Sequence, residues 1–219
     1  MLKPQDRPQQ IQKWYDRLAP LAANARQQLQ QIETPRLVRR SGCTLAPDGS
    51  LRMTLLWQAY AIDPQGFAIR RADTGQAPTE FTQALILTYL VTADGTPPSG
   101  GWIAYRDLPD GMFYAQAFRG YAENRLTREL GDEGLDGRER FCRAAQRLGG
   151  RPIDIGDAGY AFQLLPRASL AAVYWLGDED FPSRASVLFE DTAPHYLSTD
   201  GLAVLGSHMV NALLDNAGE

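Results

Sequence analysis

A stripe of apolar residues with helical spacing runs from Ile11 to Ile32 near the start of the chain. This spacing places the apolar side chains on one face of an amphipathic helix. Pro20 interrupts the stripe, because its ring removes a backbone donor and clashes with the preceding turn. We therefore predict a kinked helix or two helices in residues 1–33, which form an arm beside a single domain of residues 34–219.

Between Arg36 and Arg71 the apolar residues recur at every second position instead. The clearest run consists of Leu51, Met53, Leu55 and Trp57, with polar residues between them. Such alternation is typical of a strand with one buried face. Turn-forming sequences at 47–49 and 63–66 divide the region, so we predict an antiparallel meander of three strands.

The middle of the chain has the pattern of buried and amphipathic helices. Thr79 is a suitable N-cap residue, and Glu80 after it suits the first turn of a helix. The run at 84–91 is apolar on every side, which predicts a central, buried helix. We expect a short strand at 102–106 and then a helix from about residue 112 to residue 130.

The last third of the chain combines one amphipathic helix at about 136–148 with four strands and a closing helix. The strands are predicted at 153–155, 160–165, 170–176 and 186–189, and the last two form a hairpin around the turn at 177–182. The closing helix begins at Ser198 or Thr199. This order predicts an α+β fold with mainly antiparallel sheets, packed helices, an N-terminal helical arm and a C-terminal helix.

Composition narrows the functional classes. The chain has 219 residues, a net charge of −4 and 10% aromatic residues, so it is not a generic nucleic-acid binder and not a disordered chain. No stretch approaches the 18 apolar residues of a membrane span, and the first residues lack the apolar core of a signal peptide. We expect a cytoplasmic protein that binds neither nucleic acid nor membrane.

Basic residues are concentrated in the first third of the chain. Residues 1–71 carry a charge of +6 and residues 72–219 a charge of −10. The arginines on the predicted meander are Arg36, Arg39, Arg40, Arg52, Arg70 and Arg71. They suit a carboxylate or phosphate, but an outer sheet face or docking onto the acidic remainder explains them equally well, and their role stays open.

Common catalytic signatures are missing from the sequence. It contains no GxGxxG, GxxxxGK[ST], HExxH or GxSxG motif, which excludes the usual dinucleotide, P-loop, zincin and α/β-hydrolase sites. Two histidines and two distant cysteines leave little for a structural zinc site. We assign no metal site, and the cofactor stays unknown.

Two segments nevertheless combine glycine, aromatic, basic and acidic residues. Glycine lets the backbone approach a ligand, while aromatic rings offer flat surfaces and arginine directs hydrogen bonds. The candidate ligand-binding residues are Trp102, Tyr105, Arg106, Asp107, Tyr114, Phe118, His195 and Tyr196. The alternative interpretation is that the aromatic residues fill the core and Arg106 pairs locally.

His195 and the acidic run at 178–180 are the candidates for other chemistry. His195 lies in a loop before the last helix, where its ring could reach a cleft or could form a structural hydrogen bond. The Asp-Glu-Asp run at 178–180 could bind Mg²⁺, but a solvated hairpin turn is the commoner use of such a sequence.

Two blocks of the sequence resemble the family catalogued as domain of unknown function 3786. The first block comprises residues 87–90 and 102–111 with Tyr114 and Phe118, and the second comprises residues 174–182, 187–189 and 195–197. The resemblance covers roughly residues 35–215. It implies no established activity and points only toward corrinoid and iron–sulfur chemistry. This chain lacks the cysteine cluster that an iron–sulfur centre requires.

These observations favour a non-catalytic protein that binds a small ligand or acts as an accessory protein. Its pocket would take a flat, anionic molecule such as a tetrapyrrole or corrinoid, with His195 as an axial ligand. One alternative is an enzyme of unrecognised type, in which His195 acts as acid or base with Asp107 or Asp178 as its partner. Another is a scaffold that binds a protein partner through the N-terminal helix.

Overall fold

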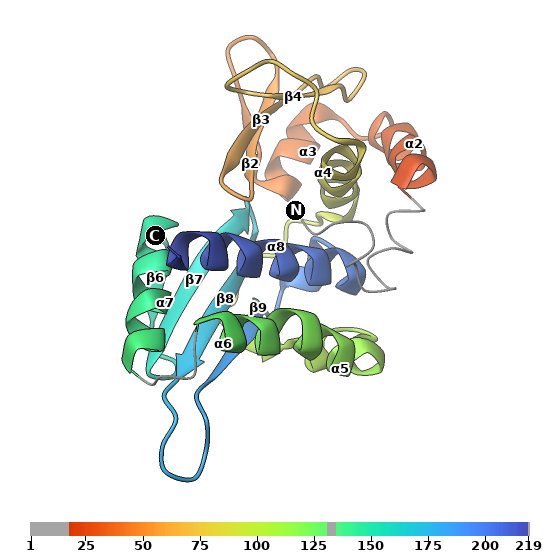
Figure 1. Ribbon diagram of the computed structural model, residues 1–219. Coiled ribbons are helices and arrows are strands. Elements are labelled where there is room, and N and C mark those ends of the chain that lie inside the picture. The colour runs from red at the N-terminus through yellow and green to blue at the C-terminus, as the bar shows by residue number, and fades with distance from the viewer. Residues whose placement is uncertain (1–17, 131–134, 219) are drawn as a thin grey trace.

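The computed structural model describes residues 18–130 and 135–218 of the chain. Within these ranges the strands form two antiparallel sheets, with helices packed beside each of them (Figure 1). The described α-helices are α2 (Leu18–Leu29), α3 (Thr34–Ser41), α4 (Glu80–Thr92), α5 (Ala115–Phe118), α6 (Asn124–Leu130), α7 (Leu135–Arg147) and α8 (Thr199–Ala217). The described strands are β1 (Thr44–Leu45), β2 (Leu51–Leu55), β3 (Gln58–Ile62), β4 (Ile69–Arg71), β5 (Trp102–Ala104), β6 (Arg151–Ile153), β7 (Ala158–Leu165), β8 (Ala168–Trp175) and β9 (Arg184–Glu190). The predicted α+β class is confirmed.

The first sheet has the order β1-β2-β3-β4, and its start differs from the predicted meander. The region between residues 36 and 71 begins with helix α3 and continues with four strands, not three. Pro35 in the first turn favours the helix, and Gly42 ends it in the left-handed conformation with φ of 71°. Leu37 and Ser41, four residues apart, form its buried face.

The alternating run that we predicted as one strand ends before Trp57. Leu56 and Trp57 form the two-residue turn between β2 and β3, with φ of 48° and 63°. Such a turn normally uses asparagine and glycine, because other side chains are strained at positive φ. Contacts with distant segments hold it in place: the Leu56 N–H donates to the Leu164 oxygen at 3.0 Å, and Trp57 Nε1 donates to the Leu148 oxygen at 2.8 Å.

Helix α4 is central and buried, as the sequence predicts. The Thr79 hydroxyl accepts a hydrogen bond from the Thr82 N–H and caps the helix, and Glu80 lies in the first turn. The helix buries residues on every side, namely Phe81, Ala84, Leu85, Ile86, Leu87, Tyr89 and Leu90.

Helix α2 packs along α4. It buries Ala22, Ala25 and Leu29, and Arg26 donates to Gln83 Oε1 at 2.9 Å. Residues 1–17, which include the start of the predicted apolar stripe at Ile11, lie outside the described residues. That residues 1–33 form a separate segment, and that this segment binds a partner, both stay predictions.

The second sheet has the order β5-β9-β8-β7-β6, and helices α6, α7 and α8 lie against it (Figure 1). Strands β8 and β9 form the predicted hairpin, with Ala172 opposite Val187. Ser198 caps helix α8 by accepting from the Gly201 N–H, which confirms the predicted helix start. Neither α8 nor any other described helix is long and apolar enough to cross a membrane.

The helical stretch that we predicted at 112–130 is divided into short pieces. A 3-10 turn, η3 (Gly111–Tyr114), precedes α5, and a π-helical segment, η4 (Arg119–Glu123), separates α5 from α6. A π-helix widens the turn and changes which residues face the sheet, and such segments occur often at functional sites. This segment places Glu123 beside strand β9.

Candidate functional site

Three of the aromatic residues predicted to form a pocket belong to the core. Tyr105 and Phe118 stack with ring centroids 4.4 Å apart, and both contact Phe189. Tyr196 stacks on Tyr89 at 6.0 Å. All of these rings are buried. Tyr105, Phe118 and Tyr196 therefore fill the core, which is the alternative interpretation of the aromatic residues given above.

The other residues of the same segment lie at or near the surface. Trp102 is half-buried in β5, and the exposed Arg106 has its Nε 3.7 Å from Asp107 Oδ1. Tyr114 is exposed and lines a groove of about 360 Å³ with residues of the loop before α8. The structure thus brings the two predicted segments together at this groove, which is lined by Pro109, Asp110, Tyr114, Pro194, Leu197, Ser198, Thr199 and Asp200.

His195 has a carboxylate partner that the sequence did not predict. Its Nδ1 lies 2.7 Å from Asp94 Oδ2 and 3.2 Å from the Thr96 hydroxyl. Asp107 pairs with Arg106 instead, and Asp178 accepts backbone N–H bonds within the hairpin turn. Burial alone would raise the pKa of Asp94, but hydrogen bonds from Thr96 and His195 outweigh it and lower that pKa to about 2.

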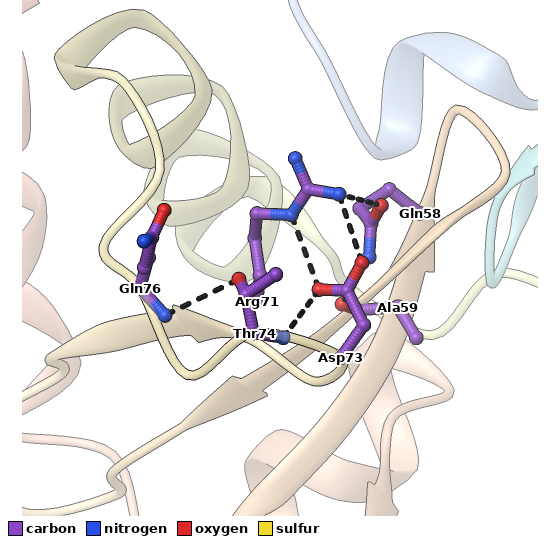
Figure 2. A network of polar contacts seen from close by, with 6 residues as sticks. All are labelled: Gln58, Ala59, Arg71, Asp73, Thr74 and Gln76. Atoms are coloured by element: carbon purple, nitrogen blue, oxygen red, sulfur yellow. Dashed lines mark hydrogen bonds and ion pairs between the residues drawn. The ribbon is translucent and has the colours of Figure 1, made fainter.

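The arginines of the first sheet are engaged in local contacts. Arg71 reaches both Asp73 and Gln58, with Nη2 2.9 Å from Asp73 Oδ2 and 2.7 Å from Gln58 Oε1 (Figure 2). Hydrogen bonding to Arg71 lowers the pKa of Asp73. Arg52 pairs with Asp48 at 2.7 Å, and Arg70 donates to the Gly75 oxygen. For Arg52, Arg70 and Arg71 these contacts fit the interpretation of an outer sheet face. The prediction was wrong for Arg36, Arg39 and Arg40, which lie on helix α3 and not on the meander.

The acidic run at 178–180 forms the tip of the β8–β9 hairpin. Asp178 Oδ1 accepts from the N–H groups of Asp180 and Phe181 at 2.9 and 2.8 Å, so this carboxylate stabilises the turn. Among the described residues, no group of three or more His, Cys, Asp or Glu side chains could hold a metal ion.

A groove that the sequence did not predict lies between the helical segment η4–α6 and strand β9. Its volume is about 560 Å³. Among the described residues, its lining consists of Arg119, Glu123, Asn124, Thr127, Arg128, Pro182, Ser183, Arg184, Ala185 and Ser186. Most of these side chains carry hydrogen-bond donors, and the set includes three arginines. We call this cavity the arginine groove.

Two side chains of the helical segment take the place of a strand at one edge of β9. Strand β5 pairs with β9 at residues 188–190. Before this point, the Ala185 N–H donates to the Thr127 hydroxyl at 2.8 Å, and the Val187 N–H donates to Glu123 Oε1 at 3.1 Å. Glu123 and Thr127, which also line the arginine groove, therefore hold the helical segment against strand β9.

Glu123 has an unusual environment for a carboxylate. Its side chain is 15% exposed, and its Oε2 lies 3.8 Å from Arg119 Nε. Burial raises the pKa of Glu123, although the Val187 N–H and the charges of Arg119, Arg184 and Arg106 oppose this effect. The exposed Arg106, predicted from the sequence, thus acts electrostatically on a residue of the arginine groove.

The arginines of the groove come from three different elements. Arg119 belongs to η4, Arg128 to α6 and Arg184 to β9. The Arg184 guanidinium lies 4.5 Å from the ring centroid of Trp175, and this cation–π contact orients its charge. A weak signal for the groove exists in the sequence, because Arg119, Glu123 and Thr127 form a polar stripe at four-residue spacing.

One comparison with known proteins gives a match. The sequence pattern of the family described as Domain of unknown function (DUF3786) matches residues 33–212 and so includes the arginine groove and His195. No curated protein and no solved structure matches the chain. Since the matched region covers most of the chain, the protein belongs to the DUF3786 family.

Proposed function

We propose that this protein binds a small, multiply charged oxyanion in the arginine groove. The observation that carries this proposal is the position of Arg119, Arg128 and Arg184, which approach one cavity from three elements. Arginine presents paired N–H donors that match carboxylate, phosphate and sulfate oxygens. Hydroxyl and amide groups beside the arginines supply further donors.

Local charge supports an anionic ligand. The whole chain carries −4, but the described lining of the groove has three arginines and one carboxylic acid. A cavity of opposite sign to its protein concentrates anions and speeds their association. A ligand with two or more negative charges gains most from this arrangement.

A small oxyanion fits these contacts better than a flat macrocycle. The rings of Tyr105, Phe118 and Tyr196, which we expected to stack on a tetrapyrrole or corrinoid, pack in the core. His195, the expected axial ligand, is in the loop before α8 and is not among the residues that line the groove. We therefore propose an anionic ligand, as expected from the sequence, but with the arginine groove as its binding site.

Titration calorimetry with sodium sulfate and sodium phosphate tests the proposal. We expect Arg184→Ala and Arg128→Ala each to weaken binding by about tenfold or more, since a hydrogen bond to a charged group contributes roughly 1.5–3 kcal/mol. Arg143→Ala is the matched control, because Arg143 is exposed on α7 and does not line the groove. Absence of binding, or equal binding by all variants, would overturn the proposal.

The contact between His195 and Asp94 favours acid–base catalysis as a second candidate function. Both hydrogen bonds of the His195 ring use Nδ1, so neither occupies Nε2. A carboxylate on Nδ1 orients the ring and leaves Nε2 as the nitrogen that can exchange a proton with a substrate. Hydrolysis of activated aryl esters by wild type, His195→Ala and Asp94→Asn tests this candidate, and equal rates in all three proteins would remove it.

A further inference from the structure

Glu123 is the one carboxylic acid among the described residues that line the arginine groove. Its two oxygens have different surroundings. Oε1 accepts from the Val187 N–H at 3.1 Å, whereas Oε2 faces Arg119 Nε at 3.8 Å. Glu123 thus joins strand β9 with one oxygen and faces a cation of the groove with the other.

An anion bound by Arg119 would compete with Glu123 for the same guanidinium. The ionised carboxylate of Glu123 would repel an anion bound at Arg119, and the repulsion is little screened because the side chain of Glu123 is largely withdrawn from water. The repulsion disappears if the carboxylate accepts a proton. Burial already disfavours the ionised form of Glu123 and raises its pKa.

The charged groups that face Glu123 come from three elements. They are Arg119 of η4, Arg184 of β9 and Arg106 of η2 (Tyr105–Asp107). Each of these positive charges acts to lower the pKa of Glu123, against the larger effect of burial. A bound anion neutralises part of this positive charge and adds its own negative charge. Both effects favour the neutral carboxyl group of Glu123 in the complex.

We propose that the arginine groove binds its oxyanion together with a proton, which is taken up from solvent by Glu123. This inference rests on the proposed function of the groove. The neutral carboxyl group keeps Oε1 as acceptor for the Val187 N–H, and its new O–H on Oε2 donates a hydrogen bond to the anion. Arg119 transfers its interaction from Glu123 to the ligand.

Linkage gives the direction of the pH dependence. If the pKa of Glu123 is higher in the complex than in the free protein, anion affinity rises as pH falls between the two pKa values. The gain is at most about tenfold per pH unit for one proton. Sulfate is the best probe, because its own charge is constant between about pH 5 and about pH 8, unlike that of phosphate.

Titration calorimetry with sulfate at several pH values is the test. In wild type we expect affinity to increase as pH falls, with uptake of up to one proton, measured as the dependence of the heat on the ionisation enthalpy of the buffer. Glu123→Gln is neutral and keeps an acceptor for Val187, so it should bind sulfate at high pH at least as well as wild type does at low pH. Its affinity should depend only weakly on pH.

Glu139→Gln is the matched control, because Glu139 is exposed on α7. It should keep the pH dependence of wild type. Sulfate binding that is independent of pH in wild type would overturn the coupling and leave anion binding intact. If neither wild type nor Glu123→Gln binds sulfate at any pH, both the coupling and the proposed function are wrong.

Discussion

The indole Nε1 of Trp57 donates a hydrogen bond to the main-chain oxygen of Leu148, which lies 91 residues later in the chain. The ring of Trp57 also meets that of Phe162 edge-on, with centroids 6.1 Å apart. These contacts join the turn between β2 and β3 to the end of helix α7 and to strand β7. The two sheets are thus connected through a turn whose backbone conformation is itself unfavourable.

Replacement of Trp57 by phenylalanine tests this connection. The variant Trp57→Phe keeps an aromatic ring but leaves the Leu148 oxygen without its donor, so we expect a loss of about 1 kcal/mol in unfolding free energy. Urea denaturation followed by circular dichroism measures the change. Unaltered stability would show that the hydrogen bond does not stabilise the joint between the sheets.

The hydroxyl of Tyr89 connects three segments in the core. It donates to the Ser41 oxygen and accepts from the Arg167 N–H, and burial raises its pKa. We expect Tyr89→Phe to lower the unfolding free energy by about 1–3 kcal/mol, because a buried backbone oxygen and a part-buried N–H group lose their partner. Tyr114→Phe, at an exposed position, should leave the denaturation midpoint unchanged, and an equal loss in both variants would contradict the prediction.

The pair of Asp94 and His195 predicts a pH-dependent stability. The pKa of Asp94 is lowered from its ordinary value of 3.8 to about 2. A carboxylate with a lowered pKa stabilises the folded state above its ordinary pKa, and this contribution disappears as pH falls through the lowered value. Asp94→Asn should therefore be less stable than wild type at neutral pH, and the two should become equally stable only below about pH 2. The measurement is the difference in unfolding free energy between wild type and Asp94→Asn at neutral and at acidic pH. A difference that does not change with pH would contradict the prediction.

A carboxylate in the middle of helix α4 should unfold the protein. Leu85 and Leu87 are fully buried, and an unpaired charge at such a position costs several kcal/mol. We expect Leu85→Asp and Leu87→Asp to lose the cooperative thermal transition seen by circular dichroism. Ala23→Asp at an exposed position of α2 is the control, and a melting temperature of Leu87→Asp equal to that of the control would refute the prediction.

Removal of residues 1–33 tests the role of the N-terminal arm. We expect a chain that begins at Thr34 to fold, because both sheets and helices α3 to α8 remain. Its melting temperature should fall by roughly 5–10 °C, since α4 loses the packing of α2, the helix that buries Ala22, Ala25 and Leu29. An insoluble or molten product would show that the arm is required for the core.

Local signals in the sequence were sufficient for several elements. The cap residues Thr79 and Ser198 mark the starts of α4 and α8 through hydrogen bonds to N–H groups three residues later. The largely apolar run at 84–91, which follows the cap at Thr79, is typical of a helix that is surrounded by other elements. These features depend on neighbours within one or two turns, so periodicity and capping chemistry identify them.

The turn at Leu56 and Trp57 shows why other features escaped prediction. Nothing in the dipeptide favours positive φ, and the conformation is held by Leu148 and Leu164, which are distant in the chain. Such tertiary contacts override local preference. An alternating pattern therefore correctly predicted strand β2 and wrongly included Trp57 in it.

The candidate sites depend on long-range contacts in the same way. His195 and Asp94 are 101 residues apart, so no spacing rule could have paired them. The Thr127 hydroxyl accepts from the Ala185 N–H across 58 residues, and the residues that line the arginine groove come from two segments that this contact joins. The sequence predicted an anionic ligand from residue types, but the position of the cavity is a property of the packed chain.

The way in which Glu123 and Thr127 cover strand β9 also bears on aggregation. The exposed edge of a sheet can recruit a strand from another molecule, because its N–H groups seek acceptors. Here the N–H groups of Ala185 and Val187 are bonded to single side-chain oxygens, which offer no continuing backbone for a further strand. Local opening of residues 119–130 would uncover this edge while the sheet is still folded. The aggregation rate of the protein should therefore follow the hydrogen-exchange opening of this helical segment more closely than its global stability.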